Sequence, residues 1–493
     1  MNPKRAIVIG SGVAGMAAAI RIAVQGYEVK LFEKNARPGG KLSEFEADGF
    51  HFDSGPSLFT QPQNIEELFE LANEPIGSYF TYEPVDISCK YFYENGKVVE
   101  AWTDADRFAM EMQQQVGERP EHIKAYLRRA SKLYHDIGTI FVDHSLHRRK
   151  TWLHKRILTA LSSVRMTYLF NSLHRFNQNK LSSKEAIQLF DRFATYNGSS
   201  PYKAPAMLSM IPHVEQNGGT YYPKGGMISI TNALYQLALK KGVQFFFNSP
   251  VQQVIHDKKI VTGVVANDQE IFADIVISNA DAYFTYSLLL KDPGKANQIL
   301  KRERSSSAVI FYWGVAGKFP QLSLHNIFFS KDYKKEFLHI FDLKTLCDDP
   351  TVYVNITSKA ESNKAPQGKE NWFVMVNAPS DNGQDWEKTK TDLRKIVLGK
   401  LKRMLGTDIE PLIETERITD PLILEADTAS FKGALYGTSS NSKLAAFLRH
   451  PNFSSTLKGL YFCGGSVHPG GGIPLCLKSA RIVSELIRDD HKK

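Results

Sequence analysis

Near the N-terminus, two short apolar runs flank a longer segment with small and aliphatic side chains. Residues 5–9 form a continuous apolar run typical of a buried strand, and a second such run covers residues 28–32 and ends at Glu33. Between them, residues 13–25 have the pattern of a buried helix. This order predicts a strand, a helix and a second strand, which is the βαβ unit of a parallel sheet.

The C-terminal part of the chain has a similar arrangement. A short apolar run at residues 460–463 leads through a glycine-rich loop into a segment with helical periodicity at residues 477–487. Pro474 suits the first turn of that helix, where its missing N–H costs nothing. No repeat, low-complexity run or Pro/Ser-rich linker separates the chain into successive domains. We therefore expect domains that are interleaved and built from discontinuous segments.

Residues 144–184 combine helical periodicity with a concentration of positive charge. Nine Lys and Arg residues and no Asp or Glu lie in this segment, and the remaining 52 Lys and Arg match the 52 Asp and Glu of the chain, so the whole net charge of +9 arises here. Apolar residues recur at three- and four-residue steps, with others beside them: Leu153, Ile157, Leu161, Val164 and Tyr168, then Trp152, Met166, Leu169, Phe170, Leu173 and Phe176. The segment is predicted to be a basic amphipathic helix.

Three interpretations of this segment remain open. In the first, its aromatic and aliphatic side chains enter a lipid surface while basic residues meet anionic headgroups, namely Arg148, Arg149, Lys150, Lys155 and Arg156. In the second, it is a surface helix with a solvated basic face. In the third, it contacts nucleic acid, although no nucleic-acid-binding motif accompanies it.

Composition excludes several classes of protein. The 493 residues suggest about two to four domains, and 42% hydrophobic with 23% charged residues is ordinary globular usage rather than disorder. The four cysteines have neither disulfide-framework nor metal-site spacing, so we expect reduced thiols in a cytosolic protein and no metal. The apolar run at residues 6–24 is interrupted by glycines and Arg21, which argues against a signal peptide or a membrane span.

The turn after the first strand has the sequence Gly10-Ser11-Gly12-Val13-Ala14-Gly15. In a dinucleotide fold the first glycine allows the tight turn, the second lets a pyrophosphate approach, and the third lets helix and strand pack closely. Glu33 follows Gly10 by 23 residues, the separation expected for an acid that binds ribose hydroxyls. The N-terminal unit is therefore predicted to bind a dinucleotide.

The residues that follow identify the type of dinucleotide. Lys34 and Arg37 precede the glycine pair Gly39-Gly40, which continues as Lys41-Leu42, and the chain then reads Gly55-Pro56-Ser57. This sequence resembles the extended FAD motif of the flavin amine oxidase and carotenoid desaturase superfamily. The resemblance implies that all of these residues contact FAD.

The C-terminal loop has the sequence from Gly464-Gly465 through His468-Pro469 to Gly472-Ile473-Pro474. Its glycines would let the N-terminus of the following helix approach a flavin ring, where the helix dipole would stabilise negative charge. This loop resembles that of the carotenoid (phytoene-type) desaturases. In amine oxidases the preceding glycine turn usually carries an acidic residue, and Gly464-Gly465-Ser466 has none.

The resemblance extends through the middle of the chain and implies a fold. In this family the segment at Val251 lies by the adenine, and the turn containing Asn279 and Ala280 lies by the cofactor. The implied fold class is α/β, with a Rossmann-type FAD-binding domain interleaved with an α+β substrate-binding domain (flavin amine oxidase/phytoene desaturase superfamily). The expected FAD-binding domain comprises residues 1–80, 222–283 and 417–493, and the substrate domain comprises residues 81–221 and 284–416.

The resemblance also implies an activity. Carotenoid desaturases introduce C=C bonds by passing a hydride to flavin N5 while a proton leaves. The motif at residues 464–477 resembles most that of the 1-hydroxycarotenoid 3,4-desaturases. We therefore expect 3,4-desaturation of an acyclic or monocyclic 1-hydroxycarotenoid. Phytoene desaturation, carotenoid isomerisation or ketolation, and amine oxidation on the same fold remain alternatives.

Catalytic residues and partners are less sharply defined by the sequence. Asp53, His213 and His468 stand in or near motifs expected at the flavin, so each is a candidate proton acceptor, although a structural role is the more common one for such a residue. The resemblance implies a carotenoid substrate and either oxygen or a quinone as electron acceptor. We expect a cytoplasmic protein, associated peripherally with the inner face of the membrane.

Overall fold

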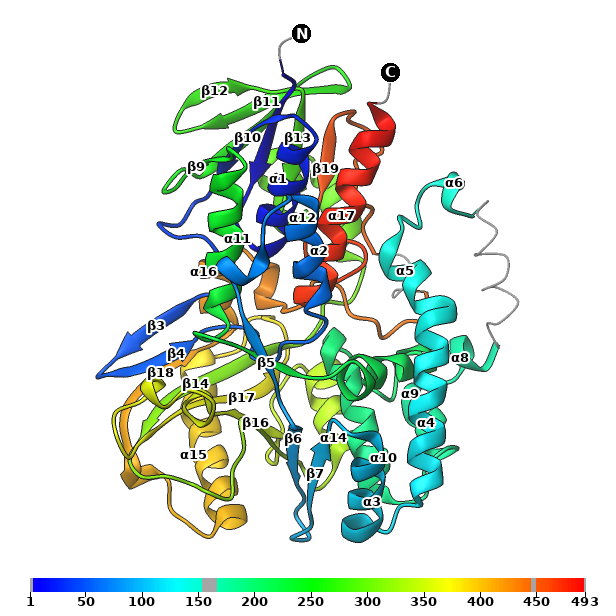
Figure 1. Cartoon of the computed structure of the whole chain (residues 1–493), viewed down its shortest axis with the longest axis vertical. Helices are drawn as coiled ribbons and strands as arrows, with labels where there is room; N and C mark the ends of the chain where they lie inside the picture. Colours follow the sequence, from blue (N-terminus) through cyan, green and yellow to red (C-terminus); the bar gives the residue numbers. More distant parts are fainter. Residues whose placement is uncertain (1–2, 153–165, 445–448, 492–493) are drawn as a thin grey trace.

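The protein contains two large β-sheets, one at each end of an elongated molecule (Figure 1). The computed structural model describes residues 3–152, 166–444 and 449–491. Both termini lie at the end that contains the smaller sheet, and the seven-stranded sheet lies at the other end.

The first sheet has five parallel strands in the order β19-β13-β1-β2-β9. These strands come from distant parts of the chain: β19 (Leu460–Phe462), β13 (Ile275–Ser278), β1 (Arg5–Ile9), β2 (Glu28–Phe32) and β9 (Gln244–Phe246). Four of the five residues of β1 and all residues of β13 are buried, as expected for a parallel sheet that is covered on both faces.

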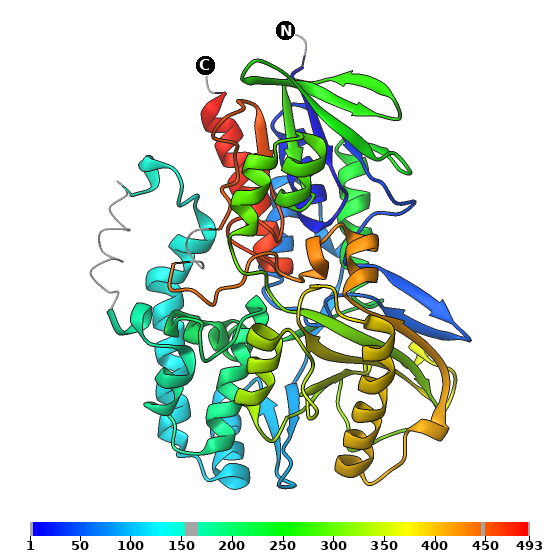
Figure 2. The same ribbon diagram turned by 180° about the vertical axis from the view of Figure 1, so that it is seen from behind.

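Helices cover one face of this sheet, and a smaller sheet with short helices covers the other. The helices of the first face pack in one apolar cluster: α1 (Val13–Val24), α2 (Gln63–Leu71), α11 (Ile228–Lys240) and α17 (Ile473–Asp490). The opposite face contacts a three-stranded antiparallel sheet and two helices: β10 (Val251–Asp257), β11 (Ile260–Ala266), β12 (Gln269–Phe272), α12 (Ala282–Phe284) and α13 (Pro293–Leu300). Figure 2 shows this side of the molecule.

The second sheet has seven strands in the order β18-β14-β17-β16-β15-β6-β7. Only the β15–β6 pair is parallel. The strands span β18 (Ile413–Thr419), β14 (Ser307–Val315), β17 (Glu370–Ala378), β16 (Val352–Asn355), β15 (His325–Phe328), β6 (Ile87–Phe92) and β7 (Val98–Trp102). β18 runs past the expected domain boundary at residue 417.

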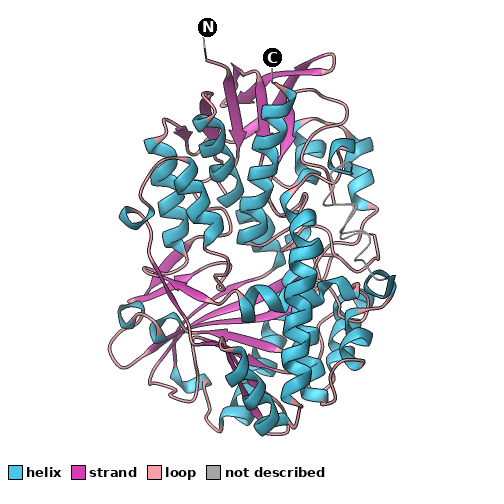
Figure 3. Cartoon of the chain, turned by 45° about the vertical axis from the view of Figure 1, so that its right-hand side comes forward, coloured by secondary structure: helices cyan, strands magenta, loops and turns pink. Residues whose placement is uncertain are grey.

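Helices lie on both sides of this sheet (Figure 3), so alternate side chains along its strands face two different helical layers. The outer face packs against α15 (Trp386–Leu405). The inner face packs against helices of the other layer: α3 (Ala105–Val116), α4 (Pro120–Leu133), α10 (Lys184–Asp191) and α14 (Tyr333–Leu338).

Two small antiparallel pairs join the halves of the molecule. The hairpin of β3 (Glu44–Ala47) and β4 (Phe50–Asp53) follows the dinucleotide motif and packs on the inner face of β14 and β17. β5 (Tyr82–Pro84) pairs with β8 (Tyr221–Pro223). The loop that precedes Ser57 is therefore held between the two large sheets.

The described parts of the basic segment contain helical stretches, and the chain leaves the helix at residues 171–172. The stretches are α6 (Arg149–Trp152), α8 (Met166–Phe170) and α9 (Leu173–Gln178), which follow α5 (Thr139–Asp143). Most of the expected amphipathic stripe, including Lys155, Arg156, Leu153, Ile157, Leu161 and Val164, lies outside the described residues. α9 begins at Leu173 because the Ser172 hydroxyl accepts a hydrogen bond from the Arg175 N–H and caps the helix.

The apolar residues of the described part divide into two groups. Tyr168, Leu173 and Phe176 are buried in the protein, and Tyr168 and Phe176 pack together near Tyr126, so these three do not face a lipid surface. The expectation that all of the apolar residues enter a bilayer is therefore wrong for these three. Phe170, by contrast, is 55% exposed, and Trp152 is also exposed.

Candidate dinucleotide and substrate site

The turn between β1 and α1 exposes backbone N–H groups at the end of a helix. Gly10 has φ +94° and Gly12 is the N-cap, with no side chain capping the first turn. A Cβ at Gly15 would lie 2.1 Å from the Gly10 carbonyl oxygen, so only glycine allows α1 to pack this closely on its strand. The uncapped N–H groups and the helix dipole suit an anion such as a pyrophosphate.

Glu33 lies at the carboxyl end of β2 and is buried. Its Oε2 accepts hydrogen bonds from the Ser11 N–H and hydroxyl, both at 2.8 Å, and its Oε1 accepts one from the Asn35 N–H at 2.9 Å. These contacts fix the carboxylate beside the glycine turn. It thereby has the position that a ribose-binding acid needs.

The Asn279 side chain connects the N-terminal and C-terminal glycine turns. Its amide Nδ2 donates to the Cys463 carbonyl at 3.2 Å, and its backbone N–H donates to the Ile9 carbonyl at 2.8 Å. A Cβ at Gly12 would lie 2.7 Å from Asn279 Oδ1, and one at Gly464 would lie 2.4 Å from its Nδ2. Both glycines therefore also make room for Asn279.

The second glycine pair packs against the first turn. The Gly39 N–H donates to the Ser11 carbonyl at 3.0 Å, and a Cβ at Gly55 would lie 1.8 Å from the Lys41 carbonyl oxygen. Lys41 Nζ donates to the Leu435 carbonyl at 2.8 Å. Burial lowers the pKa of Lys41 to about 8, although Asp281 and Cys476 oppose that shift.

The loop before α17 brings another helix N-terminus to this region. Gly472 is its N-cap with φ +107°, no side chain caps the first turn, and Pro474 lies within that turn. A Cβ at Gly472 would meet no atom within 4 Å, so the helix end opens onto space. The glycine turns, the two uncapped helix ends and the buried Glu33 fit a dinucleotide that spans from α1 to α17.

Asp53 has contacts that give it a structural role. Its carboxylate accepts hydrogen bonds from the N–H groups of Met227 (3.1 Å) and Ile228 (3.3 Å) and thereby caps α11. Burial raises the pKa of Asp53, while the Met227 N–H and the charge of Lys364 oppose that rise.

His213 lies at the start of a π-helical turn, His213–Asn217, next to α4. Its ring packs against Tyr134 and His135, and its Nδ1 is 2.9 Å from the Asn217 amide. Burial, with the neighbouring His135, lowers the pKa of His213. None of these contacts involves a residue of the glycine turns.

His468 is buried and bonded to the segment after α5. Its Nε2 donates to the His144 carbonyl at 2.9 Å, so its Nδ1 carries the lone pair, and this atom has no partner among the described residues. Burial lowers the pKa of His468 to about 4, which makes it a weak proton acceptor at neutral pH.

Other predicted cofactor residues lie at differing distances from this centre. Leu42 is buried in the same apolar cluster as Val13, Ala14 and Ile473. Lys34 donates to the Ala426 carbonyl at 2.6 Å, Arg37 is exposed, and Val251 begins the edge strand β10. No contact between these last three residues and the glycine turns is seen in the described part of the chain.

Sequence reasoning missed the contact between the glycine motif and the seven-stranded sheet. The Ser57 hydroxyl lies 2.7 Å from the Tyr353 hydroxyl, although the two residues are 296 positions apart. It also missed the buried ion pair of Asp281 with Arg304 (2.8 Å), near Lys41. The acidic residue in the Asn279-Ala280-Asp281 turn is the one signal that could have indicated this pair.

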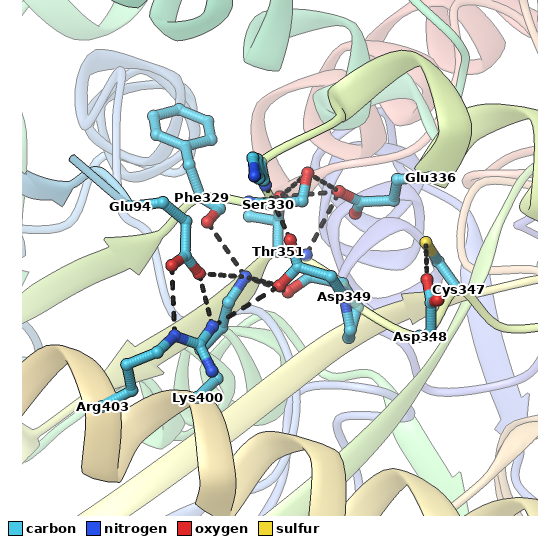
Figure 4. Close-up of polar contacts among 12 residues, drawn as sticks. Glu94, Phe329, Ser330, Glu336, Cys347, Asp348, Asp349, Thr351, Lys400 and Arg403 are labelled. Carbon is cyan, nitrogen blue, oxygen red and sulfur yellow. Dashed lines mark hydrogen bonds and ion pairs between the residues drawn. The ribbon is translucent and has the colours of Figure 1, made fainter.

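A polar region lies on the outer side of the seven-stranded sheet, where α15 meets it (Figure 4). The Lys400 Nζ lies 2.8 Å from Asp349 and 3.7 Å from Glu94 and donates to the Phe329 and Pro350 carbonyls. A cavity of about 360 Å³ beside it is lined mainly by charged residues. This lining does not suit an apolar substrate, so we interpret the region as structural.

No helix in the described part of the chain is long and apolar enough to cross a bilayer. Among the same residues, no group of three or more His, Cys, Asp or Glu side chains is arranged to hold a metal ion.

Solved structures confirm the fold. Cyclohexylamine oxidase from Brevibacterium oxydans IH-35A is similar with a TM-score of 0.64 at 15% identity, covering 100% of both chains. An oxidoreductase from Methanosarcina mazei is similar with a TM-score of 0.64 at 16% identity, covering 98% of this chain and 100% of the other. The expected α/β architecture is thus confirmed.

Sequence comparisons give the family. The profile of the flavin containing amine oxidoreductases matches residues 13–488. A 1-hydroxycarotenoid 3,4-desaturase of Flavobacterium sp. (strain P99-3) is 48% identical over 484 residues, which are 98% of this chain and 99% of that protein. A 4,4'-diaponeurosporene oxygenase of Staphylococcus haemolyticus (strain JCSC1435) is 31% identical over 491 residues, covering 99% and 97%. The chain is similar along its whole length to the desaturase and the oxygenase, and it belongs to the flavin-containing amine oxidoreductase family.

Proposed function

We infer that this protein is an FAD-dependent carotenoid desaturase that carries out 3,4-desaturation of a 1-hydroxycarotenoid. The observation that carries this inference is the 48% identity with a 1-hydroxycarotenoid 3,4-desaturase along the full length of both chains. The glycine turns and helix ends at β1, β13 and β19 supply a matching dinucleotide site.

The proposed cofactor contacts follow the motifs described above. Bound FAD supplies the oxidising chemistry, by taking a hydride from the substrate carbon as a proton leaves. The residues proposed to contact it are Gly10, Gly12, Val13, Ala14, Gly15, Glu33, Lys34, Arg37, Gly39, Gly40, Lys41, Leu42, Gly55, Pro56, Ser57, Val251, Asn279, Ala280, Gly464, Gly465, Gly472, Ile473 and Pro474. The N-terminus of α1 would bind the pyrophosphate, and the N-terminus of α17 would stabilise negative charge on the ring.

The proposal does not require a dedicated base. The contacts of Asp53, His213 and His468 favour structural roles, as capping group, packed ring and buried hydrogen-bond donor respectively. An alanine variant of any of the three that retains FAD and full turnover would remove that residue as a proton acceptor.

We further propose that the basic segment docks the enzyme on the inner face of the membrane, where a carotenoid can enter without crossing water. The docking residues would be Arg148, Arg149, Lys150, Lys155 and Arg156, with the exposed rings of Trp152 and Phe170. Lys443 Nζ lies 4.7 Å from the centre of the Phe170 ring and adds a further cation to this surface. The electron acceptor would be oxygen or a membrane quinone.

We also propose the division into an FAD-binding domain and a substrate domain that the sequence predicts, with a later start for the last segment of the FAD-binding domain. Because β18 pairs with β14 through Thr419, the last segment of the FAD-binding domain is placed after that strand, and the remaining boundaries stay at residues 80, 222 and 283.

The reaction is tested by expressing the protein in cells that supply a single carotenoid and analysing the pigments. The expected product from an acyclic or monocyclic 1-hydroxycarotenoid has lost two hydrogens and absorbs at longer wavelength. A product that has gained oxygen would instead assign the activity of the oxygenase relatives. No change in absorption with any of phytoene, lycopene or a 1-hydroxylated carotene would contradict the proposal, and flavin reduction by an amine would favour the amine oxidase alternative.

A further inference from the structure

A chain of hydrogen bonds leads from the second glycine motif into the substrate half of the molecule. The Tyr353 hydroxyl lies 2.7 Å from the Ser57 hydroxyl and 2.8 Å from His325 Nδ1. Tyr353 and His325 come from the neighbouring strands β16 and β15 and project from the inner face of the sheet. The His325 side chain is buried, since the residue is 2% exposed.

The surrounding bonds fix the position of the His325 proton. The Asn355 amide Nδ2 donates to the Leu324 carbonyl at 2.9 Å and lies 3.1 Å from His325 Nδ1. Since an N–H group faces Nδ1, this ring nitrogen is the acceptor. Burial and the charge of Arg192 lower the pKa of His325 to about 3, so the ring is neutral and its proton is on Nε2.

The His325 Nε2 is a buried donor that no described residue accepts. An unsatisfied buried N–H is costly, and the great majority of such groups in proteins have partners. The acceptor for this group is therefore expected to arrive with a ligand.

A second buried polar group, in the hydrogen-bond network of Arg192, offers an acceptor, and the charge of Arg192 acts on His325. Arg192 donates to the Tyr91 hydroxyl at 2.6 Å and pairs with Glu215, which is bonded to Ser88. The Ser88 oxygen accepts from Gln216 Nε2 at 3.0 Å, and the buried Gln216 Oε1 has no partner among the described residues. One free donor and one free acceptor are what an alcohol requires for its two hydrogen bonds.

We propose that His325, held by Tyr353 and Ser57, donates the hydrogen bond that recognises the C1 hydroxyl of a 1-hydroxycarotenoid. This inference rests on the proposed function. In such a substrate the hydroxyl-bearing carbon is separated by one carbon from C3 of the reacting bond, so the hydroxyl must bind close to the flavin. Ser57, in the glycine motif, connects the His325 network to that place.

The site would then select hydroxylated over hydrocarbon carotenoids. A hydrocarbon analogue leaves the His325 N–H unpaired, and buried polar groups reject substrates that lack their partner more strongly than apolar pockets reject shape differences. The wild-type protein is expected to prefer the 1-hydroxylated carotenoid by at least about 100-fold in kcat/KM.

The test compares an acyclic 1-hydroxycarotenoid with the same chain lacking the hydroxyl, in both turnover and binding. The FAD-loaded protein is assayed for kcat/KM, and Kd is measured from quenching of protein fluorescence by the polyene. His325→Phe should lower kcat/KM for the hydroxylated substrate by about 10- to 100-fold. It should change kcat/KM for the hydrocarbon by no more than about threefold relative to the wild type. His325→Gln, which keeps an N–H donor, should retain part of the preference, and His339→Gln, at a half-buried position on another helical turn, should retain all of it.

The outcomes separate the subsite from the reaction. An equal loss for both substrates in His325→Phe, or an unchanged preference, would overturn the subsite. If His325→Phe does not bind FAD, Tyr353→Phe is tested in its place. This variant should retain FAD and show a smaller preference for the hydroxylated carotenoid. Preferential binding of the hydroxylated carotenoid without desaturation would support the subsite and contradict the reaction. Equal desaturation of the hydroxylated carotenoid and the hydrocarbon would support the reaction and contradict the subsite.

Discussion

Lys41 is a buried cation of the candidate cofactor site, and its pKa of about 8 makes cofactor binding sensitive to pH. A bound anion favours the protonated form, so below pH 8 the lysine is already charged and binding requires no proton. Above pH 8 binding must be accompanied by proton uptake. We predict that FAD affinity falls as pH rises from 8 to 10, by up to about tenfold per unit.

The measurement is the Kd of FAD for the apoprotein at pH 7, 8 and 9. Lys41→Met should bind FAD more weakly at pH 7 and lose most of the dependence. Lys258→Met, at an exposed turn, should behave as the wild type. A steep fall above pH 8 that persists in Lys41→Met would assign the titration to another group.

Among single residues, the sequence predicted those whose partners lie close to them along the chain. Glu33 follows its glycine turn at a characteristic separation, and the structure places it against Ser11. His325 carried no such signal, because its significance depends on Tyr353, Asn355 and Ser57, which are brought to it only by strand pairing and by the β3–β4 connection.

Among the elements, α15 depends on one buried cation for its attachment to the sheet edge. Lys400 is 1% exposed, and removing its charge leaves Asp349 Oδ1 without its 2.8 Å ion pair and takes one donor from each of two carbonyls, although the Lys331 N–H still donates to Asp349 Oδ2. We predict that Lys400→Met destabilises the protein by about 2–3 kcal/mol, a value reduced from that of a fully buried pair because Asp349 is partly exposed.

Urea unfolding followed by tryptophan fluorescence measures this loss. Lys395→Met, at an exposed position of the same helix, should change stability by less than about 0.5 kcal/mol. Flavin absorbance should be retained in Lys400→Met, since its contacts are on the outer side of the sheet. Equal stability of the two variants would contradict the role given to Lys400.

The elements with strong local patterns were predicted closely. The expected strands at residues 5–9 and 28–32 coincide with β1 and β2, and α1 ends one residue before the expected limit. The seven-stranded sheet could not be assembled from the sequence, because its neighbours β15 and β6 are joined only by long-range pairing. The basic segment was expected as one helix because charge and periodicity do not reveal the break at Ser172.

For the whole molecule, the structure alters how membrane docking should be tested. Arg148 pairs with Asp490 at 2.6 Å and packs on the Phe453 ring, so changing it would also disturb α17. Arg149 and Lys150 are exposed, Lys150 to 86% although it lies 3.5 Å from Asp489, and the test changes these two together with Lys155, which lies outside the described residues. We predict that reversing these three charges to Glu weakens binding to anionic vesicles by at least about 100-fold, since three residues at about 1 kcal/mol each contribute about 3 kcal/mol.

Co-sedimentation with vesicles of anionic and neutral lipid checks this prediction, with FAD content as the measure of folding. The matched control reverses Lys388, Lys395 and Lys402 on α15, which changes the net charge by the same amount. Equal loss in both variants would indicate a general effect of charge, and undiminished binding in the first would contradict docking through this segment.

The position of Asn279 has a consequence for how proteins of this architecture can diverge. One side chain fills the space beside Gly12, Gly15 and Gly464, three positions that belong to the first and last parts of the chain. At Gly12 a larger residue becomes tolerable only if residue 279 shrinks, whereas Gly15 is also required by the Gly10 carbonyl oxygen and Gly464 by its φ of +108°. A substitution at Gly12 is therefore expected to be inherited together with a change at residue 279, in the middle of the gene.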